Sequence, residues 1–267
     1  WFPLQIEYRE KFYAAGRFPG GFFKREARPS ESEILAARAT DRPIRPLFPE
    51  GFHNDVQVFN QLLSSDSIDP TDVLCINAAS ASLTLSSAPF KGPIGAVRVG
   101  RVNGEFVINP THDEMAESDL NLIYVGSRDL PLMIEGDARE IAEADMVAAM
   151  RRGHEEVIKL VDAQLELRRK IGLEDKVVVD EAENQEEVAR VQAQFGAKLS
   201  EVLTLADKTA RQDQFKDLKE EIKAFLQDGD APASDNVVFN VIDQVEIATV
   251  RKNVLENGRR IDGRAMD

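Results

Sequence analysis

A short stretch near the start of the chain, GGFFKREARPSESE, carries the side chains best suited to bind another molecule. Two glycines precede the adjacent rings of Phe22 and Phe23, and the cations Lys24 and Arg25 follow at once. Bases of an unpaired nucleic-acid strand stack on aromatic faces, while its phosphates pair with cationic side chains. The glycines give the backbone the freedom that a tight loop needs. One interpretation of the stretch is therefore a loop that binds a single nucleic-acid strand.

Ordinary packing is a second interpretation of the same residues. Large apolar rings are usually buried, and Lys24 and Arg25 would then only keep the loop in solvent. Residue types alone favour this interpretation. The two interpretations differ in whether the rings of Phe22 and Phe23 lie in the hydrophobic interior.

The residues that follow the loop predict a helix with a row of arginines. Ser30 and Glu33 have the spacing of a capping box, which fixes the first turn of a helix. Intervals of four and three residues place the guanidinium groups of Arg38, Arg42 and Arg45 on one helical face. Such a row can bind the phosphate oxygens of a nucleic acid.

The same helix carries groups that allow a different outcome. The arginines could form structural salt bridges with Glu31, Asp41 or Glu50, which is the more common use of such a row. Pro43 and Pro46 lack the amide hydrogen that an interior helical turn needs, and each such proline costs about 3 kcal/mol. We therefore expect the helix to kink or end near Asp41.

The distribution of charge restricts where an anionic ligand could bind. The 267 residues carry 33 lysines and arginines against 47 aspartates and glutamates, a net charge of −14. This balance argues against a chain that binds nucleic acid over its whole surface. Residues 1–60 hold nine basic and eight acidic side chains, a net charge of +1. The other 207 residues hold 24 basic and 39 acidic side chains, a net charge of −15. An anion would therefore meet the first sixty residues.

Other features exclude further classes of protein. The chain has no run of about eighteen apolar residues, so we expect no membrane-spanning helix and no membrane partner. A single cysteine, Cys75, excludes an intramolecular disulfide and fits a reducing compartment. Its apolar surroundings are typical of a buried thiol rather than a nucleophile. His53, His112 and His154 are scattered and lack the spacing of a zinc site.

Periodicity predicts a mixed first part of the chain. Alternating side chains predict six strands, at residues 4–8, 56–63, 94–101, 105–109, 120–126 and 132–136. Asn103-Gly104 predicts a hairpin turn between the third and the fourth of these strands. Helical spacing predicts two long helices, at residues 69–87 and 139–170. Asp69 would cap the first of these, with Pro70 in its first turn, and Gly172 would end the second.

The second part of the chain is helical and polar. Its apolar residues recur at helical intervals in four segments, at residues 184–194, 197–209, 214–227 and 234–256. The chain leaves the last of these helices at Gly258, where a new segment, GRRIDGRAMD, begins.

Residues 18–52, FPGGFFKREARPSESEILAARATDRPIRPLFPEGF, resemble the bacterial polynucleotide phosphorylases, which are phosphorolytic 3′→5′ exoribonucleases. FFKR is similar to the aromatic-basic loop of that family, and DRPIRPLFPEGF to the helix after it. The likeness continues through PFKGPIGAVRVGRVNGEFVINPT, LPLMIEGDAREIAEADMVAAM and GRRIDGR. It covers essentially the whole chain.

The resemblance implies an α+β fold followed by helices. The core would be ribonuclease-PH-like, a mixed sheet of the ribosomal protein S5 domain 2 type with packed helices. Together with the predicted elements, this gives an amino-terminally truncated first core at residues 1–172, an all-helical linker domain at 173–256 and the opening of a second core at 257–267. Three subunits of the family close a ring.

The resemblance also implies part of an enzyme of mRNA degradation in the cytoplasm. RNA and inorganic phosphate would give nucleoside diphosphates, reversibly. In the family the catalytic residues, the phosphate site and the Mg²⁺ site belong to the second core, so we assign no catalytic or metal-binding residue here and expect this chain alone to be inactive. The implied partners are single-stranded RNA, two further subunits of a homotrimer and components of an RNA-degradation complex. A non-catalytic RNA-binding scaffold is the alternative.

The family's aromatic-basic loop lines the aperture through which single-stranded RNA enters the ring, and this reverses the preference for packed rings. The family commonly has two arginines after the two phenylalanines. Lys24 keeps the charge but lacks the planar fork of arginine. The residues assigned to contact with RNA or with its phosphates are Phe22, Phe23, Lys24, Arg25, Arg38, Arg42 and Arg45.

Overall fold

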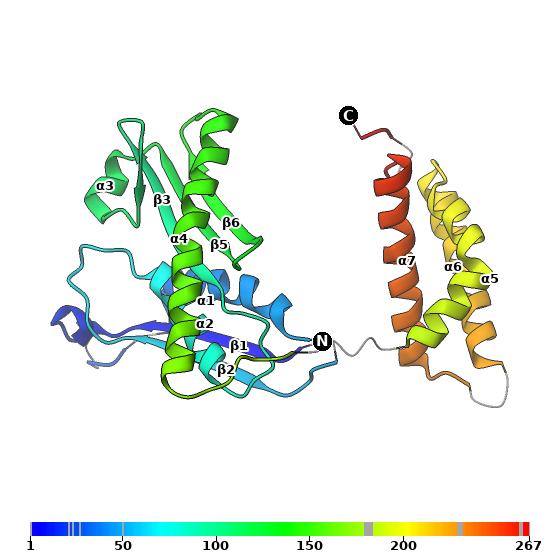
Figure 1. Ribbon diagram of the computed structural model, residues 1–267, viewed down its shortest axis with the longest axis horizontal. Coiled ribbons are helices and arrows are strands. Elements are labelled where there is room, and N and C mark those ends of the chain that lie inside the picture. Colours follow the sequence, from blue (N-terminus) through cyan, green and yellow to red (C-terminus); the bar gives the residue numbers. More distant parts are fainter. Residues whose placement is uncertain are drawn as a thin grey trace. The chain divides into compact units, whose positions relative to one another are not determined.

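The computed structural model describes residues 2–20, 22, 24–26, 28–49, 51–178, 184–228, 232–261 and 264–266. The chain divides into two units, Trp1–Glu181 and Ala182–Asp267. Strands and helices mix in the first unit, while the second consists of helices (Figure 1). Each unit has hydrophobic clusters of its own. The predicted class, α+β followed by a helical region, is confirmed.

Two parallel strands begin the first unit. β1 (Leu4–Glu10) pairs with β2 (Val56–Leu62), with Leu4 opposite Val56. Parallel neighbours need a crossover, and here the crossover contains α1 (Glu31–Ile44) with a 3₁₀ turn on each side, η1 (Phe12–Ala15) and η2 (Arg45–Leu47). The loop that carries the aromatic and basic residues lies between η1 and α1.

A four-stranded antiparallel sheet follows, in the order β4-β3-β5-β6. Its strands are β3 (Gly95–Val102), β4 (Glu105–Ile108), β5 (Leu120–Gly126) and β6 (Pro131–Ala138). Asn103 and Gly104 have φ of 51° and 84°. Positive φ at both central residues is what a type I′ hairpin turn requires, so the predicted hairpin is confirmed.

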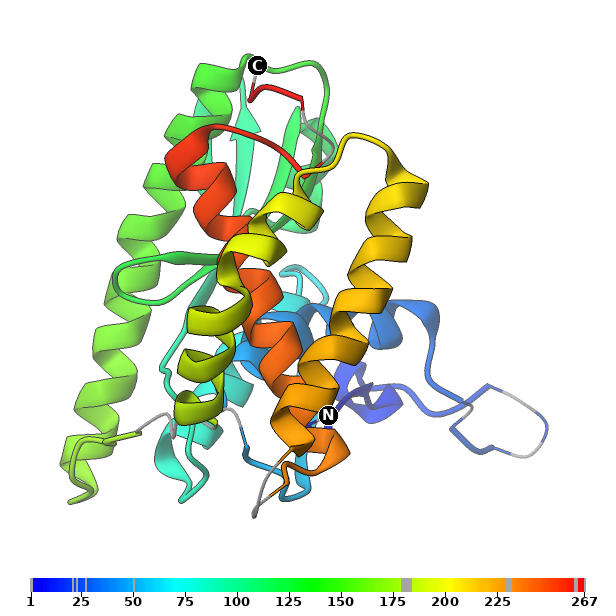
Figure 2. The same ribbon diagram turned by 90° about the vertical axis from the view of Figure 1, so that its right-hand side faces the viewer.

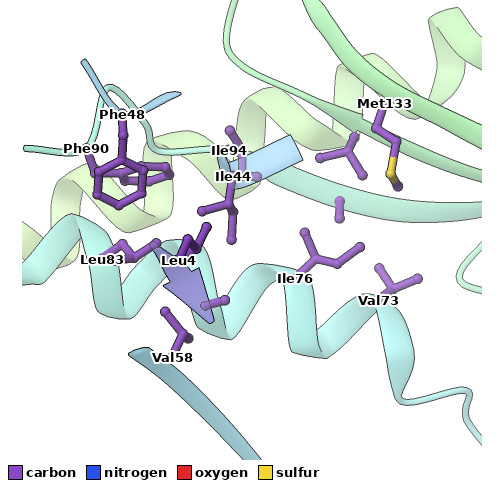
Figure 3. Packing of buried hydrophobic residues seen from close by; sticks show 13 residues of the cluster. Leu4, Ile44, Phe48, Val58, Val73, Ile76, Leu83, Phe90, Ile94 and Met133 are labelled. Carbon is purple, nitrogen blue, oxygen red and sulfur yellow. The ribbon is translucent and has the colours of Figure 1, made fainter. Parts of the chain in front are cut away.

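Neighbouring side chains on a strand point to opposite faces of the sheet, and apolar residues are buried on both faces here. Val97 and Val99 join a buried cluster with the long helix α4 (Glu143–Lys170), which lies along one face (Figure 1). Ala96 and Val125 join a second cluster with α2 (Asp72–Leu85). Figure 3 shows this second cluster, where α2 packs below the sheet and the rings of Phe48 and Phe90 lie together.

A buried polar network joins α2, α4 and the segment before β3. The Ser80 hydroxyl donates to Gln164 Oε1 at 2.7 Å, and the Ile94 amide donates to the Ser80 oxygen at 2.9 Å. The Gln164 amide nitrogen donates to the Ile94 carbonyl at 2.8 Å. Asn77 binds both the amide and the carbonyl of Ala96, at 2.9 and 2.8 Å. These bonds satisfy buried polar groups and fix α2 and α4 against the sheet.

Three predicted helix boundaries are wrong. α1 does not end near Asp41 but continues through Pro43 to the fully buried Ile44, because burial of a large apolar side chain offsets the cost of the proline. α2 begins at Asp72 rather than near residue 69, since the Asp66 carboxylate binds the Ile68 amide at 2.9 Å and holds that segment in a loop.

The third wrong boundary is the start of α4, which begins at Glu143 rather than near residue 139. β6 continues to Ala138, and the left-handed backbone of Glu140, with φ of 54°, interrupts any helix before Ala142. Gly172, with φ of 81°, ends α4 as predicted. The short helix α3 (His112–Glu117) was not predicted, although Thr111 and Glu114 form a capping box at its start.

The second unit contains three helices, α5 (Gln185–Leu203), α6 (Lys208–Gln227) and α7 (Asp235–Asn257). Figure 1 shows them side by side. The prediction of separate helices at 184–194 and 197–209 is wrong, because α5 runs through Gly196. A glycine inside a helix costs about 1 kcal/mol, and burial of Val191, Leu199 and Val202 in the shared core outweighs that cost.

Across the described part of the chain, every helix is too short or too polar to cross a lipid bilayer.

Candidate nucleic-acid interface

A single carboxylate fixes both ends of the loop between η1 and α1. Glu33 Oε1 accepts a hydrogen bond from the amide of Glu10, the last residue of β1, at 2.8 Å. Its Oε2 accepts from the amide of Ser30 at 2.6 Å, and the Ser30 hydroxyl accepts from the Glu33 amide at 3.2 Å. The predicted capping box is confirmed. It also joins the end of the strand to the start of the helix.

Burial tends to raise the pKa of Glu33, but the hydrogen bonds from Ser30 and Glu10 outweigh that effect and lower it. Because the pKa is lower in the folded chain, the ionised carboxylate stabilises the fold at pH values above the pKa of glutamate in the unfolded chain, about 4.3. This stabilisation is lost as the pH falls through the lower pKa of the folded chain.

Replacing Glu33 by glutamine is therefore expected to destabilise the first unit at neutral pH by about 1–3 kcal/mol, the range for a lost charged hydrogen bond. The difference in the free energy of unfolding between wild type and Glu33→Gln should shrink when the pH falls below about 4. Urea unfolding at several pH values measures it. A difference that stays constant with pH would show that the carboxylate charge does not hold the loop.

The described residues of the loop lie on the surface. Phe22 is 93% exposed, which excludes burial of its ring in the core. Lys24 and Arg25 are exposed as well. Phe23, the other predicted ring, lies outside the described residues. Figure 2 shows the loop in blue, extending from the body of the first unit beyond α1.

Positive charge in the loop is largely unneutralised. Glu26 is paired with Lys11, Oε2 to Nζ, at 2.6 Å. Within the described residues, no ion pair or side-chain hydrogen bond forms at four other cations of the loop, which are Arg17, Lys24, Arg25 and Arg28. Lys24 instead places its Nζ 5.3 Å from the ring centroid of Phe18, a cation–π contact. Exposed rings beside unpaired cations are the chemistry that single-stranded nucleic acids need.

The three predicted arginines, Arg38 and Arg42 of α1 and Arg45 at the start of η2, do not act as one row. Arg45 binds both carboxylate oxygens of Asp41, at 2.8 and 2.6 Å. It also donates to the carbonyls of Phe2 and Leu4, at 2.8 and 3.0 Å, so it joins α1 to β1. The prediction that Arg45 contacts RNA stays a prediction, but these four bonds already engage its guanidinium.

Arg42 and Arg38 are less constrained. Arg42 pairs with Glu135 of β6 at 2.8 Å, with both side chains about half exposed. Arg38 is exposed, and among the described residues it has neither an ion pair nor a side-chain hydrogen bond. All three arginines line a groove of about 870 Å³ between β1 and α1. Arg38 is therefore the arginine of α1 most available to a phosphate.

Alanine substitutions should separate these roles. Arg45→Ala is expected to lower the free energy of unfolding of the first unit by about 2 kcal/mol, because backbone carbonyls of β1 lose charged donors. Arg38→Ala should change stability by less than about 0.5 kcal/mol. Urea unfolding of the two variants side by side measures this. Equal destabilisation would show that Arg38 is as structural as Arg45.

Two loop residues were missed by the sequence analysis. Arg17 and Phe18 stand before the glycines and repeat the pattern of a cation beside an exposed ring. Arg17 and Arg28 also line a cavity of about 1030 Å³ at the base of the loop. The adjacency of a cation and an aromatic ring at these two positions was the available signal in the sequence.

Two other kinds of functional site, a reactive thiol and a metal site, find little support in this unit. Cys75 is buried, and burial raises the pKa of its thiol to about 11, so almost none is thiolate at neutral pH. The described residues contain no group of three His, Cys, Asp or Glu side chains that could hold a metal ion.

Comparison with known proteins identifies the family of the chain. Residues 2–89 match the model of the 3′ exoribonuclease family, domain 1, and residues 92–156 match domain 2 of the same family. Residues 186–265 match the polyribonucleotide nucleotidyltransferase RNA-binding domain. A polyribonucleotide nucleotidyltransferase of Methylacidiphilum infernorum is 45% identical over 262 residues. The chain belongs to the polyribonucleotide nucleotidyltransferase family.

Two further members of the polyribonucleotide nucleotidyltransferase family show how much of such a protein the chain represents. Those of Nitratidesulfovibrio vulgaris and Thermomicrobium roseum are 45% and 44% identical and cover 99% and 100% of this chain. The chain spans 37%, 35% and 35% of the three relatives. It is thus similar to little more than a third of each.

A solved structure supports the fold of this chain independently of these relatives. The crystal structure of rice (Oryza sativa) Rrp46 superposes with a TM-score of 0.51 over 62% of this chain and 73% of that chain. Sequence identity is only 13%, so this likeness concerns the fold alone.

Proposed function

We propose that this chain is the RNA-guiding part of a phosphorolytic 3′→5′ exoribonuclease that degrades mRNA in the cytoplasm. In this proposal, the loop between η1 and α1 binds single-stranded RNA at the entrance of a ring of three subunits. The observation that carries it is the exposed ring of Phe22 in a loop whose cations Arg17, Lys24 and Arg25 form no ion pair with any carboxylate of the described residues. Membership of the family supplies the reaction.

The reaction is a transfer of the terminal nucleotide to inorganic phosphate. A phosphate oxygen attacks the phosphorus of the last phosphodiester, the bond to the 3′ oxygen of the preceding nucleotide breaks, and that oxygen takes a proton. The product is a nucleoside diphosphate, and the reverse reaction extends RNA. A protein contributes positioning and charge stabilisation to such a step.

In this proposal, Mg²⁺, the catalytic residues and the site for inorganic phosphate belong to a further domain of the longer relatives. This chain would contribute RNA binding, the contacts that build the trimer, and surfaces for other components of an RNA-degradation complex.

Incubation of the chain with poly(A), phosphate and Mg²⁺ tests whether this chain binds RNA without catalysing its phosphorolysis. We expect retention of poly(A) in a filter-binding assay but no release of ADP. Release of ADP by the chain alone would contradict the assignment of catalysis to another domain. Failure to retain poly(A) would contradict the proposed role in guiding RNA.

Lys24 should contribute one ionic contact to the bound strand. Each phosphate neutralised on a single strand adds about 0.7 to the slope of log K against log salt. Lys24→Ala is expected to lower that slope by about 0.7, as measured by titration with poly(U) from low to moderate salt. The Lys159→Ala variant, on α4, is the control and should leave the slope unchanged. An unaltered slope for Lys24→Ala would remove this residue from the RNA path.

A non-catalytic RNA-binding scaffold is the second candidate. The family model matched by residues 186–265 is described as an RNA-binding domain, so the helical unit is another possible site of RNA contact. The two candidates differ in whether RNA held by this chain is delivered to a catalytic domain. If the longer protein phosphorolyses RNA and loses this activity when the loop is mutated, the result favours the first candidate, the exoribonuclease.

A further inference from the structure

Exposed aromatic rings are concentrated around the loop beyond the paired phenylalanines. Six aromatic side chains of the described residues are strongly exposed, and four of them lie within eleven residues of sequence, which are Phe12, Tyr13, Phe18 and Phe22. Single exposed rings are ordinary, but a group of them marks an interaction surface. The most exposed after Phe22 is Phe18, at 73%.

Phe18 is held in place by Lys24. The ammonium group of Lys24 lies over its ring, 5.3 Å from the centroid. Lys24 has a φ of 48°, a left-handed conformation that is uncommon for a residue with a side chain. The contact places the ring of Phe18 beside Lys24, a residue already assigned to RNA, although three residues of sequence separate Phe18 from Phe22.

Charge next to Phe18 is available to a ligand. Arg17 is exposed and, within the described residues, has no carboxylate partner. A ring that follows one cation in the chain and contacts a second through space can bind one nucleotide, the base on the aromatic face and the phosphate on a cation. The nearby carboxylate, Glu26, is neutralised by Lys11 and does not repel the phosphate.

We propose that Phe18 is a third base-stacking platform of the loop, positioned by Lys24, with Arg17 binding the adjacent phosphate. This inference rests on the proposed role of the loop in binding RNA. It extends the site from the two adjacent phenylalanines to a third nucleotide on the other side of the glycines. The ligand is an unpaired polynucleotide of any sequence, because every base has an aromatic face.

Leucine and tryptophan substitutions distinguish stacking from packing. Phe18→Leu keeps apolar volume but removes the aromatic face, and it is expected to weaken binding of poly(U) about tenfold, the equivalent of a lost stack. Phe18→Trp should bind at least as tightly as wild type. Phe59→Leu, at an exposed ring of β2, is the matched control and should leave affinity unchanged. Affinities of the 267-residue chain are measured by fluorescence titration at one low salt concentration.

The outcomes separate this inference from the proposed function. If Phe22→Leu weakens binding and Phe18→Leu does not, the third platform is refuted and the loop still binds RNA. If neither variant weakens binding, both proposals fail. Equal weakening by Phe18→Leu and Phe18→Trp, or a lower thermal midpoint for both, would show that Phe18 acts through packing and would also overturn the inference.

Discussion

Replacing Phe22 and Phe23 together by alanine is expected to weaken binding of long single-stranded RNA by about 2–6 kcal/mol. Each base stacked on an aromatic side chain is worth about 1–3 kcal/mol, and the two changes remove two such platforms. The dissociation constant should therefore rise about 30-fold or more. The measurement is a titration of the 267-residue chain with poly(A) and poly(U), both of which should be affected because stacking tolerates any base.

The control for this effect is the same change at an exposed ring outside the loop. Phe59→Ala, in β2, removes a ring that is 57% exposed and should leave RNA affinity within about twofold. The double variant should keep the thermal midpoint of wild type, since Phe22 buries almost nothing. Unchanged RNA affinity of the double variant would return the two rings to a structural role and would remove the loop from the RNA path.

The largest effect on stability is expected from Phe90→Ala. Phe90 is fully buried, with its ring centroid 5.8 Å from that of Phe48 in the cluster that joins β1, α2 and the sheet (Figure 3). Its removal leaves a cavity that surrounding groups fill only in part, which costs about 3–5 kcal/mol for this substitution. Hydrogen exchange of the amides of α2 and β5 in increasing urea measures the loss within the first unit.

Phe59→Ala is again the matched control, because the chemical change is the same and the ring is exposed. It should alter the exchange free energies of α2 and β5 by less than about 0.5 kcal/mol. An effect of Phe90→Ala as small as that of Phe59→Ala would mean that the aromatic cluster is not the centre of the fold. The base of the loop between η1 and α1 would then need another source of rigidity.

Features with a local physical cause were predictable from the sequence. The hairpin at Asn103-Gly104 follows from the positive φ that its turn requires. The helix start at Ser30 follows from a capping box, whose two hydrogen bonds join residues three apart. Such elements depend on near neighbours alone, so no knowledge of tertiary contacts was needed.

Features decided by tertiary contacts were not predictable. The continuation of α1 through Pro43 depends on the burial of Ile44 in a core that the linear pattern does not show. The structural role of Arg45 depends on the carbonyls of Phe2 and Leu4, more than forty residues away in sequence. The regular spacing of Arg38, Arg42 and Arg45 predicted a shared face, but partners from other elements decide which arginine is available.

The candidate site was only partly predictable for the same reason. Residue types identified the loop but favoured packing of its rings, and only the structure shows that the ring of Phe22 is exposed. The contact of Lys24 with Phe18 also depends on a backbone conformation that residue types do not indicate. The family resemblance supplied the ligand, whereas the structure shows which side chains are exposed to meet it.

Photo-crosslinking of the 267-residue chain to thiouridine-substituted single-stranded RNA, with the attached peptides mapped by mass spectrometry, tests the RNA-binding role of the loop most directly. We expect crosslinks within residues 17–28, and their loss when the aromatic residues of the loop are replaced by alanine. Crosslinks confined to the helices of residues 185–257, with none in the loop, would contradict the proposed interface.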